Sequence, residues 1–284
     1  MAFRLMIAGL KAMPQSFARR LAIGVFELFG YHLGIRKFVA QRQLSRVFPD
    51  MSIGRQRKVL RSMYRKMALG ALESYVIADS QLIETTSVSG RENVVEALSS
   101  GRGAILLTAH FGSWEAARIL PALGIPLSVI AKKQRNRLFN DYTDRVRQKQ
   151  GAQVIDMKKG LRAIMERLEQ NELVAILADQ NAGARGLVTD FLGYPASHWK
   201  GAAKLSLRKK IPILPAFALR KDDDLLEIVF ETPIYHPEWE DNEENCVKLI
   251  AEGNSIIETY IRRYPDQWFW VHKRWKYAYD MFSE

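Results

Sequence analysis

Short apolar runs alternate with amphipathic stretches from about residue 86 to the C-terminal end of the chain. The runs AILLT (104–108), LVAIL (173–177) and IPILPAFALR (211–220) are continuous, as is typical of strands buried on both faces of a sheet. Stretches with helical spacing, such as WEAARILPALG and GLRAIMERLEQNE, lie between them. Strands that alternate with helices predict an α/β fold, a layered αβα domain with a mostly parallel central sheet and an antiparallel edge.

The N-terminal part of the chain has a different pattern. In residues 1–35, apolar positions recur at helical spacing among basic residues, and no acidic residue occurs before Glu27. A long helix is predicted from about Ser52, with a core face formed by Val59, Leu60, Met63, Met67, Leu72 and Val76. A change of composition near residue 85 divides the chain into a basic helical segment, 1–85, and an α/β catalytic domain, 86–284.

The net charge of +11 comes from the N-terminal quarter, because residues 1–72 contain 14 Lys and Arg but only two acidic residues. A basic segment beside a neutral domain predicts an anionic partner, which is a membrane surface, a nucleic acid or an acidic protein. The aromatic residues near the N-terminus lie on an apolar helix face, which favours an anionic membrane surface and argues against a nucleic acid. The apolar stretch 21–35 is shorter than the 20 or so residues that span a bilayer. A surface helix is therefore favoured, with a short or tilted span and an ordinary amphipathic helix as the alternatives.

Polar side chains follow two of the predicted strands. His110 lies two residues after the run AILLT, and Asp179 and Gln180 lie two and three residues after LVAIL. In α/β folds the carboxyl ends of the strands line the crevice that binds ligands. We expect Glu115, in the first turn of the next helix, to accept a hydrogen bond from one nitrogen of His110, which leaves the other nitrogen as a general base. The alternative is that Glu115 only complements the helix dipole.

The chain lacks the motifs of several other kinds of enzyme. It contains no G-x-S-x-G, no P-loop, no H-E-x-x-H and no G-x-G-x-x-G, and we expect neither a cofactor nor a metal. Its single cysteine, Cys246, excludes an intramolecular disulfide and a cysteine-cluster metal site. A base without a protein nucleophile implies direct activation of a substrate hydroxyl, as in a transferase, or of water, as in a hydrolase.

Three blocks of sequence carry a resemblance to a known family. HFGSWE (110–115) resembles the H-x4-D/E signature of the lysophospholipid and glycerolipid acyltransferase superfamily, in the form found in bacterial lipid A late acyltransferases of the lauroyl/myristoyl type. The block LADQNAGARGLVTDFLGYPASHWKGAAKLSLRKKIPILPAFALR and the ending YPDQWFWVHKRWK are similar to that family in the same order. The resemblance implies that His110 deprotonates an acceptor hydroxyl, which attacks an acyl thioester, while Glu115 orients and charge-stabilises His110.

The same resemblance implies substrates and a location. The acceptor would be a lipid A precursor and the donor an acyl carrier protein, which is strongly acidic, or acyl-CoA. The alternative acceptors are phosphatidylinositol mannoside, another glycolipid or a lysophospholipid. The family implies a place at the cytoplasmic face of the inner membrane.

Further positions are weaker candidates for substrate binding. Arg147 matches an Arg-x3-Gly of the family and, with Arg137, is a candidate to bind an acceptor phosphate. Asp190 lies where some relatives carry an acid near the histidine, whereas others carry a neutral residue. Asp179 and Gln180 suit either the floor of the site or a helix cap. Trp268 in the last block suits either the bilayer interface or packing on the sheet, and packing is favoured.

Overall fold

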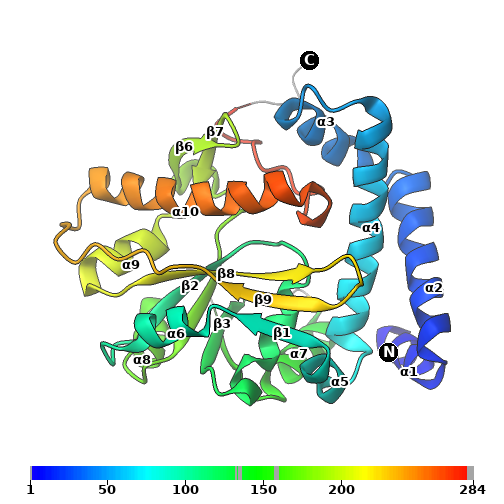
Figure 1. Cartoon of the computed structure of the whole chain (residues 1–284), viewed down its shortest axis with the longest axis horizontal. Helices are drawn as coiled ribbons and strands as arrows, with labels where there is room; N and C mark the ends of the chain where they lie inside the picture. Colours follow the sequence, from blue (N-terminus) through cyan, green and yellow to red (C-terminus); the bar gives the residue numbers. More distant parts are fainter. Residues whose placement is uncertain (1, 132, 134–135, 157–159, 280–284) are drawn as a thin grey trace.

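A seven-stranded sheet in the order β1-β9-β8-β2-β5-β3-β4 forms the centre of the molecule (Figure 1). The computed structural model describes residues 2–131, 133, 136–156 and 160–279. The strands of the sheet are β1 (Thr86–Ser89), β2 (Ala104–Thr108), β3 (Leu127–Ala131), β4 (Gln153–Asp156), β5 (Leu173–Leu177), β8 (Ile213–Arg220) and β9 (Leu226–Phe230). All neighbouring pairs are parallel except β8 and β9, which confirms the predicted parallel centre with an antiparallel edge.

Helices cover both faces of the sheet, as the continuous apolar strands predict. One face packs on α9 (Gly201–Lys209) and α10 (Glu243–Arg263), and the other on α6 (Arg91–Leu98) and η2 (Trp114–Leu123). Along β2, Ile105 and Leu107 belong to the first core cluster and Leu106 to the second. The predicted helix at η2 is a 3-10 helix, with Pro121 in its interior.

The remaining elements connect the strands. The helices α7 (Arg137–Gln148) and α8 (Gly160–Leu168) lie between β3, β4 and β5 in the chain. An antiparallel hairpin of β6 (Leu187–Phe191) and β7 (Tyr194–His198), which the apolar pattern did not predict, lies beside α10 (Figure 1). The described residues also form two short 3-10 turns, η4 (Gly183–Arg185) and η5 (Pro265–Gln267).

The N-terminal segment is helical, as predicted. It consists of α1 (Ala2–Ala12), α2 (Gln15–Phe26), the π-helical η1 (Glu27–His32), α3 (Lys37–Val47), α4 (Ile53–Tyr75) and α5 (Asp79–Glu84). Ser52 caps α4 by accepting a hydrogen bond from the backbone nitrogen of Arg55 at 3.3 Å, which agrees with the predicted start of that helix. Among the helices of the described residues, none combines the length and apolar character needed to cross a bilayer.

Helix α4 shares one hydrophobic core with the sheet. Its residues Leu60 and Met63 are each 1% exposed and belong to the same core cluster as Ile105 and Phe217. In Figure 1, α4 stands along one end of the sheet and α2 packs on its outer side. The inner face of the N-terminal segment is therefore part of the core that positions the strands.

A buried side chain of α3 hydrogen-bonds to the C-terminal segment, residues 268–279. Gln43 is fully buried; its Nε2 donates to the carbonyl oxygens of Trp270 at 2.6 Å and His272 at 2.8 Å. Its Oε1 accepts a hydrogen bond from the backbone nitrogen of Arg274 at 2.8 Å. These three bonds satisfy the backbone of a segment that forms no helix or strand, and they hold Trp268 against the strand ends.

A buried pair of basic side chains makes stability depend on pH. His198 is 2% exposed, and the guanidinium of Arg274 donates to its Nδ1 at 2.9 Å. Burial, together with the charge of Arg274, lowers the pKa of His198 to about 3. The unfolded chain protonates His198 near pH 6.5, whereas the folded chain does so only near pH 3. The free energy of unfolding is therefore highest above pH 6.5 and falls as the pH drops toward 3.

We expect His198 to cost the protein about 1.4 kcal/mol of unfolding free energy for each pH unit below 6.5, because only the unfolded state binds the proton. Urea unfolding of the wild type and of His198→Gln at pH 7, 6 and 5 measures this as a difference in slope. The variant removes the titrating ring, so its stability should fall less steeply with pH. Equal slopes in both proteins would show that His198 is accessible to protons in the folded state.

Candidate active site

His110 and Asp179 meet because their strands are paired in register. Thr108 at the end of β2 lies opposite Leu177 at the end of β5, and each polar residue follows two positions later. Nδ1 of His110 is 2.9 Å from Oδ1 of Asp179. Parallel neighbours end at the same edge of a sheet, so the sequence prediction that both residues lie at this edge is confirmed.

The Asp179 carboxylate is buried and ionised. It is 3% exposed, and its Oδ2 accepts a hydrogen bond from Nε1 of Trp268 at 2.9 Å. Burial acts to raise the pKa of Asp179, but the charge and hydrogen bond of His110 and the bond from Trp268 together hold that pKa below its usual value. An ionised Asp179 can only accept a hydrogen bond, so Nδ1 of His110 is the protonated nitrogen that donates to it. This selects the tautomer in which Nε2 is unprotonated.

The second nitrogen of His110 faces Gln180, whose Nε2 lies 3.2 Å from Nε2 of the imidazole. An amide nitrogen only donates, so Nε2 of His110 is the acceptor in this contact. The rings of Trp114 and Phe269 flank the imidazole, with centroids 5.2 and 5.9 Å away. His110 therefore has one fixed nitrogen, one basic nitrogen and an aromatic surround.

Glu115 does not accept the hydrogen bond from His110 that the sequence led us to expect. Its carboxylate instead forms a two-pronged pair with Arg147, with Nε to Oε2 at 3.0 Å and NH2 to Oε1 at 2.5 Å. The physical reason is that Asp179, which follows β5, lies next to Nδ1 of His110. Arg147 on α7 lies next to Glu115, and its planar guanidinium matches both carboxylate oxygens. Spacing along the chain revealed the Glu115 position but not the residue that pairs with it.

The other predicted site residues fall into two groups. Gln180 contacts His110, and Arg147 lies beside Glu115. Arg137 is the first residue of α7 and is exposed, and Asp190 is exposed on β6. The structure does not join Arg137 and Asp190 to either pair, so their roles stay predictions.

Trp268 contacts the site, although its sequence pattern predicted only packing on the sheet or a place at a bilayer interface. It is 2% exposed, which fits packing on the sheet and excludes a place at a bilayer interface. One general rule indicates its hydrogen bond to Asp179, because the N–H of a buried indole needs an acceptor. Nothing in the local pattern identified that acceptor as Asp179, 89 residues away.

Several hollows border the loop from Gly112 to Glu115; a small one contains His110 and Trp268, and two larger ones contain Glu115. One lies between the sheet and η2, and its lining includes Leu106, Ala175 and Ile228 as well as Trp114 and Glu115. The other lies between α4 and the loop, and its lining includes Phe26, Met67, Gly70 and Tyr75, again with Trp114 and Glu115. Both are mostly apolar, so the charged pair of Glu115 and Arg147 stands beside surfaces suited to hydrocarbon. No group of three or more potential His, Cys, Asp or Glu metal ligands occurs within the described part of the chain.

Comparisons with known proteins find one family model and several related acyltransferases. The model of the family "Bacterial lipid A biosynthesis acyltransferase" matches residues 2–277. The chain is 26% identical to the lipid A biosynthesis palmitoleoyltransferase of Escherichia coli over 85% of this chain and 79% of that protein. It is 23% identical to the lauroyltransferase of the same organism, over 93% and 87% of the two chains. A phosphatidylinositol mannoside acyltransferase of Mycobacterium tuberculosis is 28% identical over 45% of this chain and 42% of that protein.

Proposed function

Because the chain belongs to the bacterial lipid A biosynthesis acyltransferase family, we propose that it transfers a fatty acyl chain from an acyl thioester to a hydroxyl of a lipid A precursor. Membership of this family makes the chain an enzyme that acylates a lipid. The observation that best supports the proposed reaction is the pair of His110 with an ionised, buried Asp179, which leaves Nε2 of His110 as the base.

In the proposed reaction, Nε2 of His110 takes the proton of the acceptor hydroxyl as its oxygen attacks the thioester carbonyl. The hydroxyl must replace Gln180 as the hydrogen-bond partner of Nε2. Asp179 stabilises the imidazolium that forms, and the tetrahedral intermediate collapses by expelling the thiolate, which takes the proton from His110. The products are the ester and the free thiol, and no acyl-enzyme forms.

The pair of Glu115 and Arg147 has a separate proposed role. Glu115 holds the guanidinium of Arg147 in place with two bonds, next to the apolar hollow beneath η2. We assign that hollow to the hydrocarbon chain of a substrate and Arg147 to a phosphate group, because Glu115 takes only the Nε–NH2 edge of the guanidinium and its remaining N–H groups can donate to phosphate oxygens. Arg137, at the exposed start of the same helix, is a further candidate for phosphate.

The direct test is a transfer assay with dodecanoyl acyl carrier protein and a tetra-acylated, Kdo-bearing lipid A precursor, read by mass spectrometry. We expect the precursor to gain one acyl chain, and His110→Ala to lower the rate at least about 10³-fold because the base is lost. Acyl-CoA as donor and phosphatidylinositol mannoside as acceptor are run in parallel. A gain only on the mannoside would replace the proposed acceptor, and a His110→Ala variant of undiminished activity would refute the mechanism.

A second test separates the two carboxylates. Asp179→Asn should lower kcat about 10³-fold, because an amide at this position no longer stabilises the imidazolium. Glu115→Gln should mainly raise the KM for the acceptor, since it loosens Arg147. Asp241→Asn, which breaks an exposed pair with Arg208, is the control and should change neither constant. If Glu115→Gln abolishes kcat while Asp179→Asn does not, Glu115 is the orienting residue that the motif implies.

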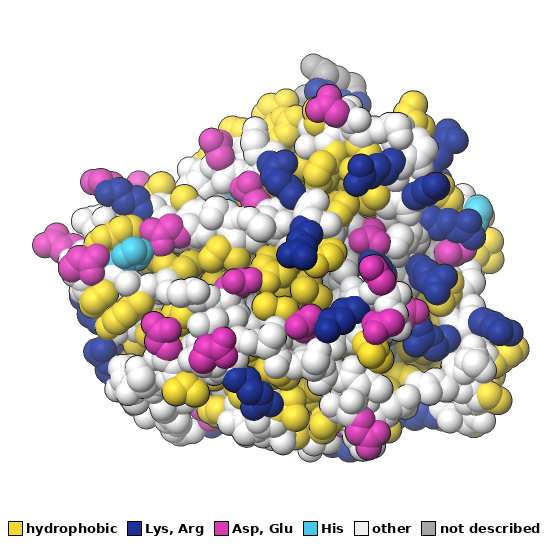
Figure 2. Space-filling model, in the orientation of Figure 1, with side chains coloured by type: hydrophobic (Ala, Val, Ile, Leu, Met, Phe, Trp, Pro, Cys, Tyr) yellow, Lys and Arg dark blue, Asp and Glu magenta, His cyan; other side chains and the backbone are white. Residues whose placement is uncertain are grey.

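We also propose that the N-terminal helices bind the anionic lipid surface at the cytoplasmic face of the inner membrane. Side chains of α1, α2 and α3 expose much of their apolar surface, with Leu5 63%, Phe17 54% and Phe38 67% exposed. Lys and Arg side chains gather over the part of the surface where α2, α3 and α4 lie (Figure 2). Apolar and basic groups on one surface suit a lipid bilayer, and the same charge suits an acidic acyl carrier protein as donor.

Vesicle flotation tests this assignment. Replacing Leu5, Phe17 and Phe38 together with Ser should weaken binding to phosphatidylglycerol-containing vesicles at least about tenfold, because apolar surface no longer enters the interface. High salt should weaken wild-type binding as well. Val95→Ser on α6 removes an equally exposed apolar side chain, 71% exposed, and should have no effect. Equal binding by the triple variant and the wild type would place the lipid contact elsewhere.

A further inference from the structure

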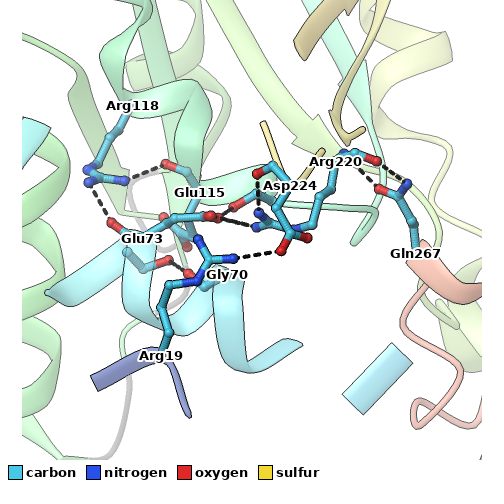
Figure 3. Close-up of polar contacts among 10 residues, drawn as sticks. Arg19, Gly70, Glu73, Glu115, Arg118, Arg220, Asp224 and Gln267 are labelled. Carbon is cyan, nitrogen blue, oxygen red and sulfur yellow. Dashed lines mark hydrogen bonds and ion pairs between the residues drawn. The ribbon is translucent and has the colours of Figure 1, made fainter. Parts of the chain in front are cut away.

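A buried ion pair joins the N-terminal segment to the sheet beside the candidate active site. Glu73, near the C-terminal end of α4, is 9% exposed, and Arg220, the last residue of β8, is 3% exposed. NH2 of Arg220 lies 2.6 Å from each carboxylate oxygen of Glu73. Figure 3 shows Glu73 between Arg220 on one side and Arg118 on the other.

The same Glu73 side chain holds the loop between His110 and Glu115. The hydroxyl of Ser113, which is 2% exposed, donates to Oε2 of Glu73 at 2.5 Å. The backbone nitrogen of Ser113 donates to the carbonyl of Ala218 on β8 at 2.9 Å. Ser113 is therefore fixed in two directions, by its side chain to α4 and by its backbone to β8.

The neighbours of Ser113 are tied to the same group. Gly112 donates its backbone hydrogen to the carbonyl of Gln267 at 2.8 Å, and the Gln267 side chain exchanges two hydrogen bonds with the backbone of Arg220. On the other side, Arg118 donates to the carbonyl of Glu73 at 2.8 Å and to that of Glu115 at 3.2 Å. Each end of the loop thus reaches Glu73 or Arg220 through one intermediate side chain (Figure 3).

Close packing transmits any movement of this group to the loop. Gly112 has a φ of +56°, and a Cβ atom there would lie 2.0 Å from the carbonyl oxygen of Ala218. The backbone therefore touches β8 directly, and a shift of the end of β8 displaces Gly112. His110 lies two residues before Gly112. Among the backbone hydrogen bonds of the described residues, its carbonyl accepts one, from the backbone nitrogen of Phe269 at 3.1 Å.

A buried ion pair fixes the geometry of its neighbours more than it stabilises the fold. Removing two charges from water costs about as much as their attraction returns, and apolar residues of similar volume often stabilise a core as well. Charge-assisted hydrogen bonds do fix angles and distances. A base must stay within a fraction of an ångström of its working position, because a displacement of about 1 Å costs on the order of 100-fold in rate.

We propose that Glu73 and Arg220 are positioning residues of the acyl transfer reaction, which set the places of His110 and Glu115 through Ser113. This role rests on the proposed function of His110 as the base. The helix that carries the positioning carboxylate belongs to the basic N-terminal segment, so this segment contributes to the chemical step as well as to the fold.

The chain contains a matched control for this group. At the opposite end of the sheet, Ser128 on β3 is fully buried and donates its hydroxyl to Oε2 of Glu172 at 2.5 Å. Arg167 lies 3.6 Å from the same carboxylate. Ser128→Ala thus removes a serine-to-glutamate bond of the same length beside an arginine, away from His110.

The experiment compares Ser113→Ala, Glu73→Gln and their combination with Ser128→Ala, by kcat, by the KM for each substrate and by Tm. Ser113→Ala should lower kcat at least about tenfold with each KM within about twofold, while its Tm matches that of Ser128→Ala. In the double variant the loss of kcat should be smaller than the product of the single losses by about fivefold or more, because both changes break one path.

Two outcomes overturn the proposal. One is a loss of kcat in Ser113→Ala no greater than that in Ser128→Ala, and the other is a pair of losses that simply multiply. Amide hydrogen exchange supplies a measurement that does not depend on activity, because Ser113→Ala should speed exchange at Gly112 and Ser113 and Ser128→Ala should not. If the wild type transfers no acyl chain, the proposed function fails, and unchanged exchange would reject the positioning role separately.

Discussion

The register between β2 and β5 is the constraint on which the candidate site depends. It brings His110 and Asp179 together at one sheet edge, two residues beyond a paired Thr108 and Leu177. A buried carboxylate is costly unless it is hydrogen-bonded, so Asp179 requires the indole of Trp268. That indole is held in turn by the C-terminal segment, which Gln43 fastens to α3. Gln43 and Trp268 thus link α3 and the C-terminal segment to the buried carboxylate at the strand ends.

The H-x4-E spacing suggests that His110 and Glu115 act together, but in the structure each pairs with a different residue. His110 and Asp179 form the pair suited to moving a proton, whereas Glu115 and Arg147 form a pair suited to holding charge beside apolar surfaces. The aromatic ring of Trp114 lies next to His110 and lines the same hollow as Glu115 and Arg147. Under the proposed function, the short segment from His110 to Glu115 joins the residue that moves the proton to the pair that binds substrate.

The N-terminal segment has two faces of different character. Its inner face contributes Leu60 and Met63 to the core and Glu73 to the loop beside His110. Its outer face carries exposed apolar residues and most of the excess positive charge. Apolar and basic groups on an outer face are what the proposed contact with an anionic bilayer requires.

The sequence by itself determined the layered α/β fold, the start of α4 and the presence of His110, Asp179 and Gln180 at strand ends, because each follows from a local pattern of apolar residues. It also revealed the basic N-terminal segment. Only the tertiary structure decided that Asp179 rather than Glu115 contacts His110, that Trp268 serves Asp179, and that Glu73 meets Ser113 and Arg220. Local patterns report which residues are buried, whereas hydrogen-bond partners far apart in the chain depend on strand order and register, which no local pattern contains.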